Sequence, residues 1–334
     1  MVGSASISST SEFMDDGFEV PVLKSDQVGR FLAEVFRWDS QIMLYRWSVL
    51  FYSIFRNRSY TPVMINRLNN KKGSRGHLEK NFFAFIQMRR SGLVRTGEIA
   101  PSLGLSRSQE WELLRRLART GSVVRLQRGL YLAPTFFSAG GKWNPSESVV
   151  LPALMKALKG QYQISGPSAF NRYGFDEQVP NRIFVYNNRL SGSRQIGSTQ
   201  YVFIRVSDDR LGEVEKVRTP DGEELYYSSR SRALVDVLYD WSRFNGIPRG
   251  LAWIRQELQK GSVSAADLAR IAVCFGNQST LRRLGWTLER AGVSPATLKI
   301  VKKALNKSNS LIPLVPLKQG KGPAIKAWGV IDNE

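Results

Sequence analysis

The sequence predicts a fold that is mostly α-helical with an α+β part: a small module of helices and a hairpin, then a larger α+β domain that ends in a helical block. The length of 334 residues suggests two domains, at roughly 150 residues per domain. Apolar residues recur every three to four positions in many segments, which indicates helices. Strand-like runs occur together before a set of helices, which is typical of an α+β domain.

The first 80 residues differ in composition from the rest of the chain. Residues 1–25 are small and polar, and we expect them to be disordered. Residues 26–57 have helical periodicity, and residues 58–80 are rich in Asn, Lys, Gly and Ser, which is typical of a linker. Two interpretations stay open: this region adds a dimerisation or docking helix, or translation starts nearer Met64.

A small module is predicted at residues 81–137, and it opens with two helices. The apolar residues of Phe82–Arg89 indicate the first helix. Thr96 is a candidate N-cap for a short second helix, because its hydroxyl could accept a backbone N–H of the first turn. Pro101 removes a backbone donor and disfavours helical geometry at the residue before it, so this helix starts later or is irregular. Gly104 then provides a turn.

The third helix of this module has two contrasting faces. Ser106 is predicted as its N-cap, with Gln109 placed to complete a capping box, and Gly121 ends it. Its apolar residues form one stripe, made of Leu113, Leu114 and Leu117. The opposite face and its flanks carry polar, aromatic and basic residues: Ser108, Gln109, Trp111, Glu112, Arg115, Arg116 and Arg119.

A hairpin follows the third helix. Val123–Leu126 and Gly129–Leu132 are strand-like and flank a turn at Gln127-Arg128. A short helix, a glycine turn, a capped basic helix and a hairpin form the order of a winged helix-turn-helix, in which the basic helix enters the major groove of DNA. An arginine-rich helix face is more often only solvated, so the order of elements carries more weight than the face alone.

The predicted DNA-binding residues lie on the third helix, just before it and in the hairpin. Between Phe82 and Phe137 nine Arg and three Glu leave a local excess of +6. If six phosphates were neutralised, the affinity would fall with salt at a log–log slope of about −5. The residues are polar, basic or aromatic and suit contacts with bases or phosphates: Thr96, Ser106, Arg107, Ser108, Gln109, Trp111, Arg115, Arg116, Arg119, Arg125, Gln127 and Arg128.

The composition favours a polyanionic partner and argues against several kinds of site. For a formal charge of +20, nucleic acid is the default partner and an anionic membrane the weaker competitor. The single Cys excludes an intrachain disulfide, and the single His excludes most zinc sites and His-based triads. We therefore expect no catalytic residue, metal or cofactor. We also expect a soluble cytoplasmic protein without a membrane partner.

The larger domain is predicted at residues 145–334. A helix over 146–159 opens it. Strand-like runs follow, at 182–186, 200–206, 214–217 and 224–227. A helical block then covers 230–241, 251–259, 265–275, 278–291 and 295–305, before a basic tail.

Several segments, taken in order, resemble the AbiEi family of type IV antitoxins, which is named for abortive infection. In the small module these are Thr96–Ser106, Leu113–Leu117 and Arg128–Tyr131. In the larger domain they are Tyr162–Ala169, Tyr173-Gly174, Gln178–Pro180, Arg189–Gly197, Ser228–Asp236, Arg282–Trp286, Pro313–Leu317 and Trp328–Val330. No single motif is specific, but their order is.

The resemblance implies a bipartite transcriptional repressor. Its winged helix would bind an inverted-repeat operator in double-stranded DNA upstream of its own operon, as a homodimer on DNA. Its C-terminal domain would counteract a nucleotidyltransferase-like toxin, directly or indirectly. Two other classes stay open: an RNA-processing or nucleotidyl-transferring enzyme that uses the basic surface for substrate, and an interaction protein whose winged helix binds another protein.

Other groups of polar residues have simpler interpretations. Gly192-Ser193 and Asp208-Asp209 are better interpreted as turns than as a nucleotidyltransferase site, because adjacent carboxylates on a strand point to opposite faces. Arg232 and Asp236, one helical turn apart, indicate an ion pair on a helix surface. Cys274 lies in an apolar helix and is expected to be an inert core residue.

The C-terminal tail is basic. It contains several lysines and no acidic residue between Lys299 and Lys326, and arginines lie just before it. This cluster is either a second basic surface, which contacts nucleic acid or an acidic toxin, or a solvated face. Its residues are Arg282, Arg283, Arg290, Lys299, Lys302 and Lys303.

Overall fold

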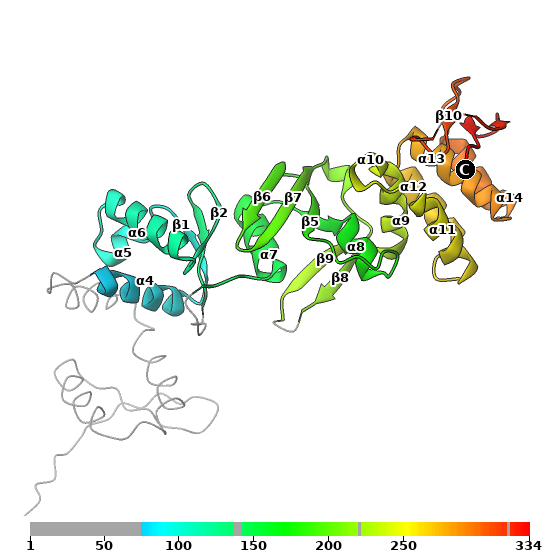
Figure 1. Ribbon diagram of the computed structural model, residues 1–334. Coiled ribbons are helices and arrows are strands. Elements are labelled where there is room, and N and C mark those ends of the chain that lie inside the picture. The colour runs from blue at the N-terminus through cyan, green and yellow to red at the C-terminus, as the bar shows by residue number, and fades with distance from the viewer. Residues whose placement is uncertain (1–74, 136–141, 220–221, 319–320) are drawn as a thin grey trace, which may run out of the picture. The chain divides into compact units, whose positions relative to one another are not determined.

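The computed structural model describes residues 75–135, 142–219, 222–318 and 321–334. These residues form a mixed α/β structure with eleven α-helices and three sheets (Figure 1). They belong to one compact unit, Lys72–Glu334. The expected disordered tail, the expected helix over 26–57 and most of the expected linker lie outside the described residues.

The first six elements of the described chain form a small module. They are α4 (Arg75–Arg89), β1 (Leu93–Arg95), α5 (Ala100–Leu103), α6 (Arg107–Thr120), β2 (Val124–Gln127) and β3 (Leu130–Leu132). The strands form an antiparallel sheet in the order β1-β3-β2. Phe82 and Ile86 of α4 are fully buried in one apolar cluster with the leucine stripe of α6.

Helix α4 begins earlier than its sequence predicts. It starts at Arg75, so the last part of the segment expected to be a linker, 58–80, is helical and that boundary is wrong. Two side-chain contacts support this end of the helix. The amide of Asn81 lies 3.2 Å from Nδ1 of His77, and Glu79 forms an ion pair with Arg116 of α6 at 2.9 Å. The polar residues before Asn81 therefore belong to a partly exposed helix end and not to a linker.

Helix α5 begins later than Thr96 would require. Its N-cap is Ile99, which makes no side-chain hydrogen bond, so the prediction of Thr96 as N-cap is wrong. Pro101 lies in the first turn of the helix, where a backbone N–H would have no acceptor within the helix, so proline is tolerated there. The helix accordingly starts at Ala100. The backbone N–H of Thr96 instead donates to the carbonyl of Gly129 in the hairpin, at 3.0 Å.

Helix α6 has the ends that its sequence predicts. The hydroxyl of Ser106 accepts the N–H of Gln109, and the Gln109 side chain accepts the N–H of Ser106 at 2.8 Å, which completes the capping box. Gly121 ends the helix in the left-handed conformation at φ 78°, which glycine adopts without a Cβ clash. The predicted apolar stripe is buried: Leu113, Leu114 and Leu117.

A six-stranded mixed sheet forms the centre of the larger domain. Its order is β6-β7-β5-β4-β9-β8, so β6 and β8 are the two edge strands. Helix α7 (Glu147–Leu158) precedes the sheet, and α8 (Pro167–Arg172) and the short helix η1 (Asp208–Arg210) lie between strands. The strands are β4 (Tyr162–Ser165), β5 (Arg182–Asn187), β6 (Gly192–Ile196), β7 (Thr199–Arg205), β8 (Val214–Arg218) and β9 (Glu224–Ser228).

Two of these strands, β4 and β6, are absent from the sequence prediction. The interpretation of Gly192-Ser193 as a turn is wrong, because both residues pair with β7 at the start of β6. The polar composition of β6 reflects its place at a sheet edge, where most of its residues are exposed. Asp208-Asp209 does form a turn, as predicted, within η1.

The helical block follows the sheet, and each predicted helix is found. It comprises α9 (Arg230–Tyr239), α10 (Trp241–Phe244), α11 (Arg249–Gln259), α12 (Ala265–Phe275), α13 (Gln278–Arg290) and α14 (Pro295–Ala304). Cys274 is exposed, so its prediction as a core residue is wrong. The buried face of α12 contains Leu268, Ile271 and Ala272, and Cys274 lies off this face.

The C-terminal segment closes over α13. Three two-residue strands form a small sheet: β10 (Ile312–Pro313), β11 (Ala324–Ile325) and β12 (Val330–Ile331). Trp328 is buried against α13, where Gly285 leaves room for its ring: a Cβ at Gly285 would lie 2.1 Å from it. The indole N–H donates to Glu289. The aromatic end of the chain is therefore part of the domain core.

One apolar cluster joins the hairpin to the larger domain. Leu126 of β2 is buried in the same cluster as Leu151 of α7 and Ile196 of β6. A backbone hydrogen bond also connects the two parts: the N–H of Trp143, which precedes α7, donates to the carbonyl of Gly121, which ends α6, at 2.9 Å. The hairpin thus has one face packed on the larger domain, while Arg125 and Arg128 stay exposed.

A buried charge cluster lies where α9 meets the sheet. Arg232 and Asp236 are fully buried, and Arg232 Nε lies 2.9 Å from Asp236 Oδ1. Arg210 Nη2 donates to the same oxygen at 2.8 Å. The predicted ion pair therefore exists, but its placement on a helix surface is wrong, because α9 is buried around most of its circumference. The hydroxyls of Ser165 and Ser228 donate to the other carboxylate oxygen.

The charge of Asp236 is retained despite its burial. Burial alone would raise its pKa, but the guanidinium groups of Arg232 and Arg210 hold the pKa below its ordinary value. Three charges are thus removed from water together, and their ion pairs and hydrogen bonds offset part of the lost solvation. Among the described residues, Nε and Nη1 of Arg210 are buried without a hydrogen-bond partner.

Candidate nucleic-acid interface

The outer face of α6 is exposed along its length. The leucine stripe on the other side is buried, so the helix docks by one face and presents the other to solvent. This exposed face carries hydrogen-bond donors of the kind that contact base edges and phosphates. Arg107 is exposed at the start of α6. The exposed side chains also include six of the seven that the sequence places on this face and its flanks: Ser108, Gln109, Trp111, Glu112, Arg115 and Arg119.

Trp111 and Arg115 form a stacked pair on this face. The guanidinium carbon of Arg115 lies 5.3 Å from the centroid of the Trp111 ring, and Trp111 is 52% exposed. Such a cation–π contact restrains the long arginine side chain while its N–H groups, which lie in the plane of the guanidinium, stay free to donate. Arg115 is therefore held at the surface in a form that suits bidentate contacts.

Arg116 is separated from the other predicted residues. Its Nε donates to Glu79 of α4 at 2.9 Å, and the side chain is only partly exposed. This ion pair ties α6 to α4. The structure thus gives Arg116 a role inside the small module, and it does not bring this side chain to the exposed face.

The hairpin carries a second set of predicted residues. Arg125 and Arg128 are exposed, and Arg125 Nε donates to the carbonyl of Gln127 at 3.3 Å. Gly129 has a φ of 73°, which allows the tight turn. The exposed side chain of Thr96 lies next to this turn, because its backbone bonds to Gly129. Thr96 and the hairpin arginines therefore come together.

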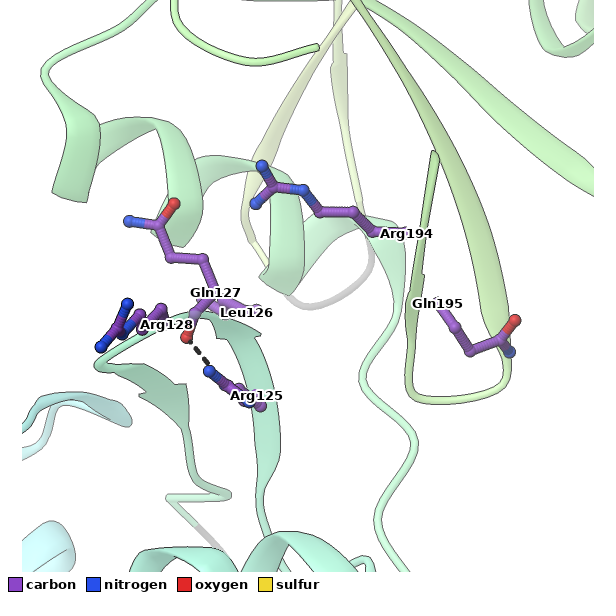
Figure 2. Close-up of a pocket in the computed structure, with 6 residues that line it drawn as sticks. All are labelled: Arg125, Leu126, Gln127, Arg128, Arg194 and Gln195. Atoms are coloured by element: carbon purple, nitrogen blue, oxygen red, sulfur yellow. Dashed lines mark hydrogen bonds between the residues drawn. The ribbon is translucent and has the colours of Figure 1, made fainter. Parts of the chain in front are cut away.

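A shallow depression lies between the hairpin and the edge strand β6 (Figure 2). Its volume is about 570 Å³. Its lining consists of Arg125, Leu126, Gln127 and Arg128 of the hairpin with Arg194 and Gln195 of β6. Sequence reasoning missed the last two residues, because the approach of β6 to the hairpin depends on tertiary packing.

Glu110 positions α6 and was also missed. It is fully buried, and its carboxylate accepts the backbone N–H of Gly97 at 2.8 Å and that of Ile99 at 2.9 Å. These donors lie just before α5, so one side chain of α6 fixes the start of the preceding helix. A signal was present: Glu110 lies three and four residues before Leu113 and Leu114, on the apolar stripe.

The expected second basic surface is only partly present. Arg282 and Arg283 are buried, and they donate to backbone carbonyls, Arg282 to Ser310 and Arg283 to Leu314. Their assignment to a surface is therefore wrong. Burial lowers the pKa of Arg283 to about 10. These arginines occupy a helix face that the C-terminal segment covers, which local sequence does not reveal.

The other members of that cluster are exposed. Arg290 forms ion pairs with Asp332 and Glu334, so part of its charge is balanced within the chain. Lys302 lies 4.9 Å from the ring of Trp328. Lys299 and Lys303 are exposed on α14. The remaining basic surface is therefore smaller than the sequence predicts.

The carboxylates of η1 do not gather into a metal-ligand set. Asp208 accepts the side-chain amide of Asn188 at 2.9 Å. Within the part of the chain that the structure describes, no three His, Cys, Asp or Glu side chains come close enough to hold a metal ion. Across the same residues, every helix is too short or too polar to cross a membrane.

Comparison with known proteins gives one family. Residues 84–134 match the family model described as a transcriptional regulator, AbiEi antitoxin, which confirms the resemblance over this segment. The matched family is one of regulators rather than of enzymes. A search of curated proteins finds no match. Among solved structures, the crystal structure of the RV2827C protein from Mycobacterium tuberculosis is similar, with 16% identity, a TM-score of 0.47, and coverage of 75% of this chain and 90% of that chain.

Proposed function

Because residues 84–134 match the AbiEi antitoxin family of transcriptional regulators, we propose that this protein regulates transcription by binding double-stranded DNA. Residues 81–137 act as a winged helix-turn-helix, with α6 as the recognition helix and the β2–β3 hairpin as the wing. The observation that carries this proposal is the two-faced α6: its apolar stripe is buried and its basic, polar face is exposed.

Different exposed residues of α6 and the hairpin contact different parts of the DNA. The N-terminal part of a recognition helix contacts base edges, and Ser108 and Gln109 lie there on a turn fixed by the capping box. Arg115 and Arg119 can each donate two hydrogen bonds to a guanine or bind a phosphate. The hairpin arginines contact the backbone beside the groove and fix the register of the module.

The regulator binds an inverted-repeat operator upstream of its own gene, one copy of the chain on each half-site. A homodimer fits this arrangement, because twofold symmetry in the protein matches twofold symmetry in the operator. The domain at residues 145–334 counteracts a nucleotidyltransferase-like toxin, directly or indirectly. The core of its helical block contains no residue of the small module, which supports a separate role for it.

A gel-shift measurement tests the DNA-binding part of this proposal. The purified full chain is titrated onto duplex DNA from upstream of its own gene, with random duplex as competitor, at two salt concentrations. We expect binding that resists the competitor and weakens with salt. Binding that the random duplex removes completely would leave only a basic protein with non-specific affinity, and the proposal would fail.

The toxin part is tested separately. The gene beside that of the regulator is expressed with and without the regulator, and growth of the host is measured. Rescue by the full chain, and also by a variant that no longer binds DNA, is expected if residues 145–334 counteract the toxin. Rescue that is lost with DNA binding would contradict a separate role for this domain.

A further inference from the structure

The larger domain places one arginine beside the wing. Arg194 lies on the edge strand β6, and Figure 2 shows its side chain reaching toward Gln127 of the hairpin. Arg125 and Arg128 lie around the hairpin turn on the other side of the depression. Three guanidinium groups from two parts of the chain thus surround one open depression.

The charge of this depression is unbalanced. Its six lining residues include three arginines and no carboxylate. Among the described residues, Arg125, Arg128 and Arg194 form no ion pair, unlike most arginines of the helical block. Arg194 is partly exposed, and its guanidinium carbon lies 5.7 Å from the centroid of the Phe203 ring. This cation–π contact restrains the guanidinium without neutralising its charge. Such a surface attracts an anion with several charged oxygens.

The packing holds these groups in place. Leu126 of the hairpin and Ile196 of β6 are 2% and 1% exposed and belong to one apolar cluster. Both strands are therefore attached to the same core. Arg125 and Arg194 lie on these strands, and Arg128 lies in the turn that joins β2 to β3. This shared core supports the position of Arg194 beside the hairpin.

We propose that Arg194 extends the DNA-binding surface from the small module onto the larger domain. It binds a phosphate of the duplex backbone next to the phosphates that Arg125 and Arg128 bind. The inference rests on the proposed function, since the hairpin must lie along DNA for Arg194 to reach a phosphate. The shallow depression suits a continuous backbone better than a small enclosed anion, and the hairpin leads directly from the recognition helix to it.

The test is the salt dependence of binding. Each phosphate neutralised contributes about 0.9 to the slope of log affinity against log salt. We expect Arg194→Gln in the full chain to reduce the slope by about one phosphate, and to leave the preference for upstream over random duplex unchanged. Arg194→Lys keeps the charge and retains the slope. The matched control is Arg218→Gln, an exposed arginine on β8, the opposite edge of the same sheet.

The outcomes separate this inference from the proposal on which it rests. If Arg115→Ala and Arg125→Ala weaken binding but Arg194→Gln and Arg218→Gln both leave the slope unchanged, Arg194 does not contact DNA and the inference is overturned. If none of these variants changes binding, the winged-helix proposal fails as well. The thermal unfolding temperature of each variant is compared with that of the wild type. Equal temperatures show that Arg194→Gln acts at the surface and not on the fold.

Discussion

The buried carboxylate of Glu110 accepts the backbone N–H of Ile99 at 2.9 Å. Its other oxygen accepts the N–H of Gly97 at 2.8 Å, so α6 holds the segment that leads into α5. Backbone donors at a helix start have no partner within the helix and need one from elsewhere. Here α6 itself supplies it, which couples the angle between α5 and α6 to a single side chain.

Replacing Glu110 is therefore expected to loosen the small module. In Glu110→Ala the buried N–H of Ile99 loses its partner, which costs about 1–3 kcal/mol. Urea unfolding would show the loss, and DNA affinity would fall because α6 no longer has a fixed position. Glu112→Ala is the control: Glu112 is exposed on the same helix, and its change should stay within about 0.5 kcal/mol. Equal unfolding midpoints for the two variants would contradict this role of Glu110.

Arg115→Ala and Arg119→Ala are each expected to weaken binding to the upstream duplex. The loss should be about 1–3 kcal/mol for whichever arginine contacts a base, and smaller for one that contacts a phosphate. Fluorescence anisotropy with single base-pair changes in the duplex distinguishes the two cases. If neither variant weakens binding while Arg125→Ala and Arg128→Ala do, the hairpin dominates and the assignment of α6 as recognition helix is wrong.

Asp236→Asn tests the buried charge cluster. The change leaves the guanidinium groups of Arg232 and Arg210 without their buried counter-charge, and we expect a loss of about 3–5 kcal/mol in the free energy of unfolding. Asp209→Asn, an exposed neighbour in η1, should have little effect. A small loss in Asp236→Asn, measured by urea unfolding, would mean that water reaches the cluster.

Glu215 gives a prediction for the pH dependence of stability. Hydrogen bonds from Arg172 and Tyr173 lower the pKa of Glu215 below its ordinary value of 4.5. A lowered pKa stabilises the fold fully above 4.5, and this contribution disappears as the pH falls through the lowered value. Because the ion pair is partly exposed, Glu215→Gln should cost no more than about 1 kcal/mol at pH 7.

The difference between wild type and Glu215→Gln should shrink as the pH falls from 5 toward 3. Glu223→Gln, at an exposed residue just before β9, controls for the loss of one charge. Urea unfolding over this pH range measures the difference. A constant difference across the range would show that the ion pairs of Glu215 do not contribute to stability.

The sequence predicts those elements whose signals are local. The helices of the block are amphipathic, and several begin at capping residues such as Ser264, Asn277 and Ser294, so their bounds can be read from a few neighbouring residues. The capping box and the glycine end of α6 are local in the same way. Their partners lie within one helical turn.

The missed features depend on partners far along the chain. β4 is buried on both faces although it contains Gln163 and Ser165, whose partners are Ser228 and Asp236 in later elements. The burial of Arg283 requires the C-terminal segment, and the place of Arg194 requires β6 to lie beside the hairpin. No window of neighbouring residues contains this information, so the candidate interface could be predicted on α6 but not on β6.

Photo-crosslinking from α6 tests the central claim most directly. The chain has a single cysteine, the exposed Cys274, so a photoreactive label can be moved to the outer face of α6 in the double variant Glu112→Cys, Cys274→Ser. The wild-type chain labelled at Cys274 is the matched control. We expect the label at position 112 to cross-link to bases of the upstream duplex, at defined positions, and the label at Cys274 to give no defined pattern. A bound duplex that cross-links from Cys274 as strongly as from position 112, or not at all from position 112, would contradict α6 as the recognition helix.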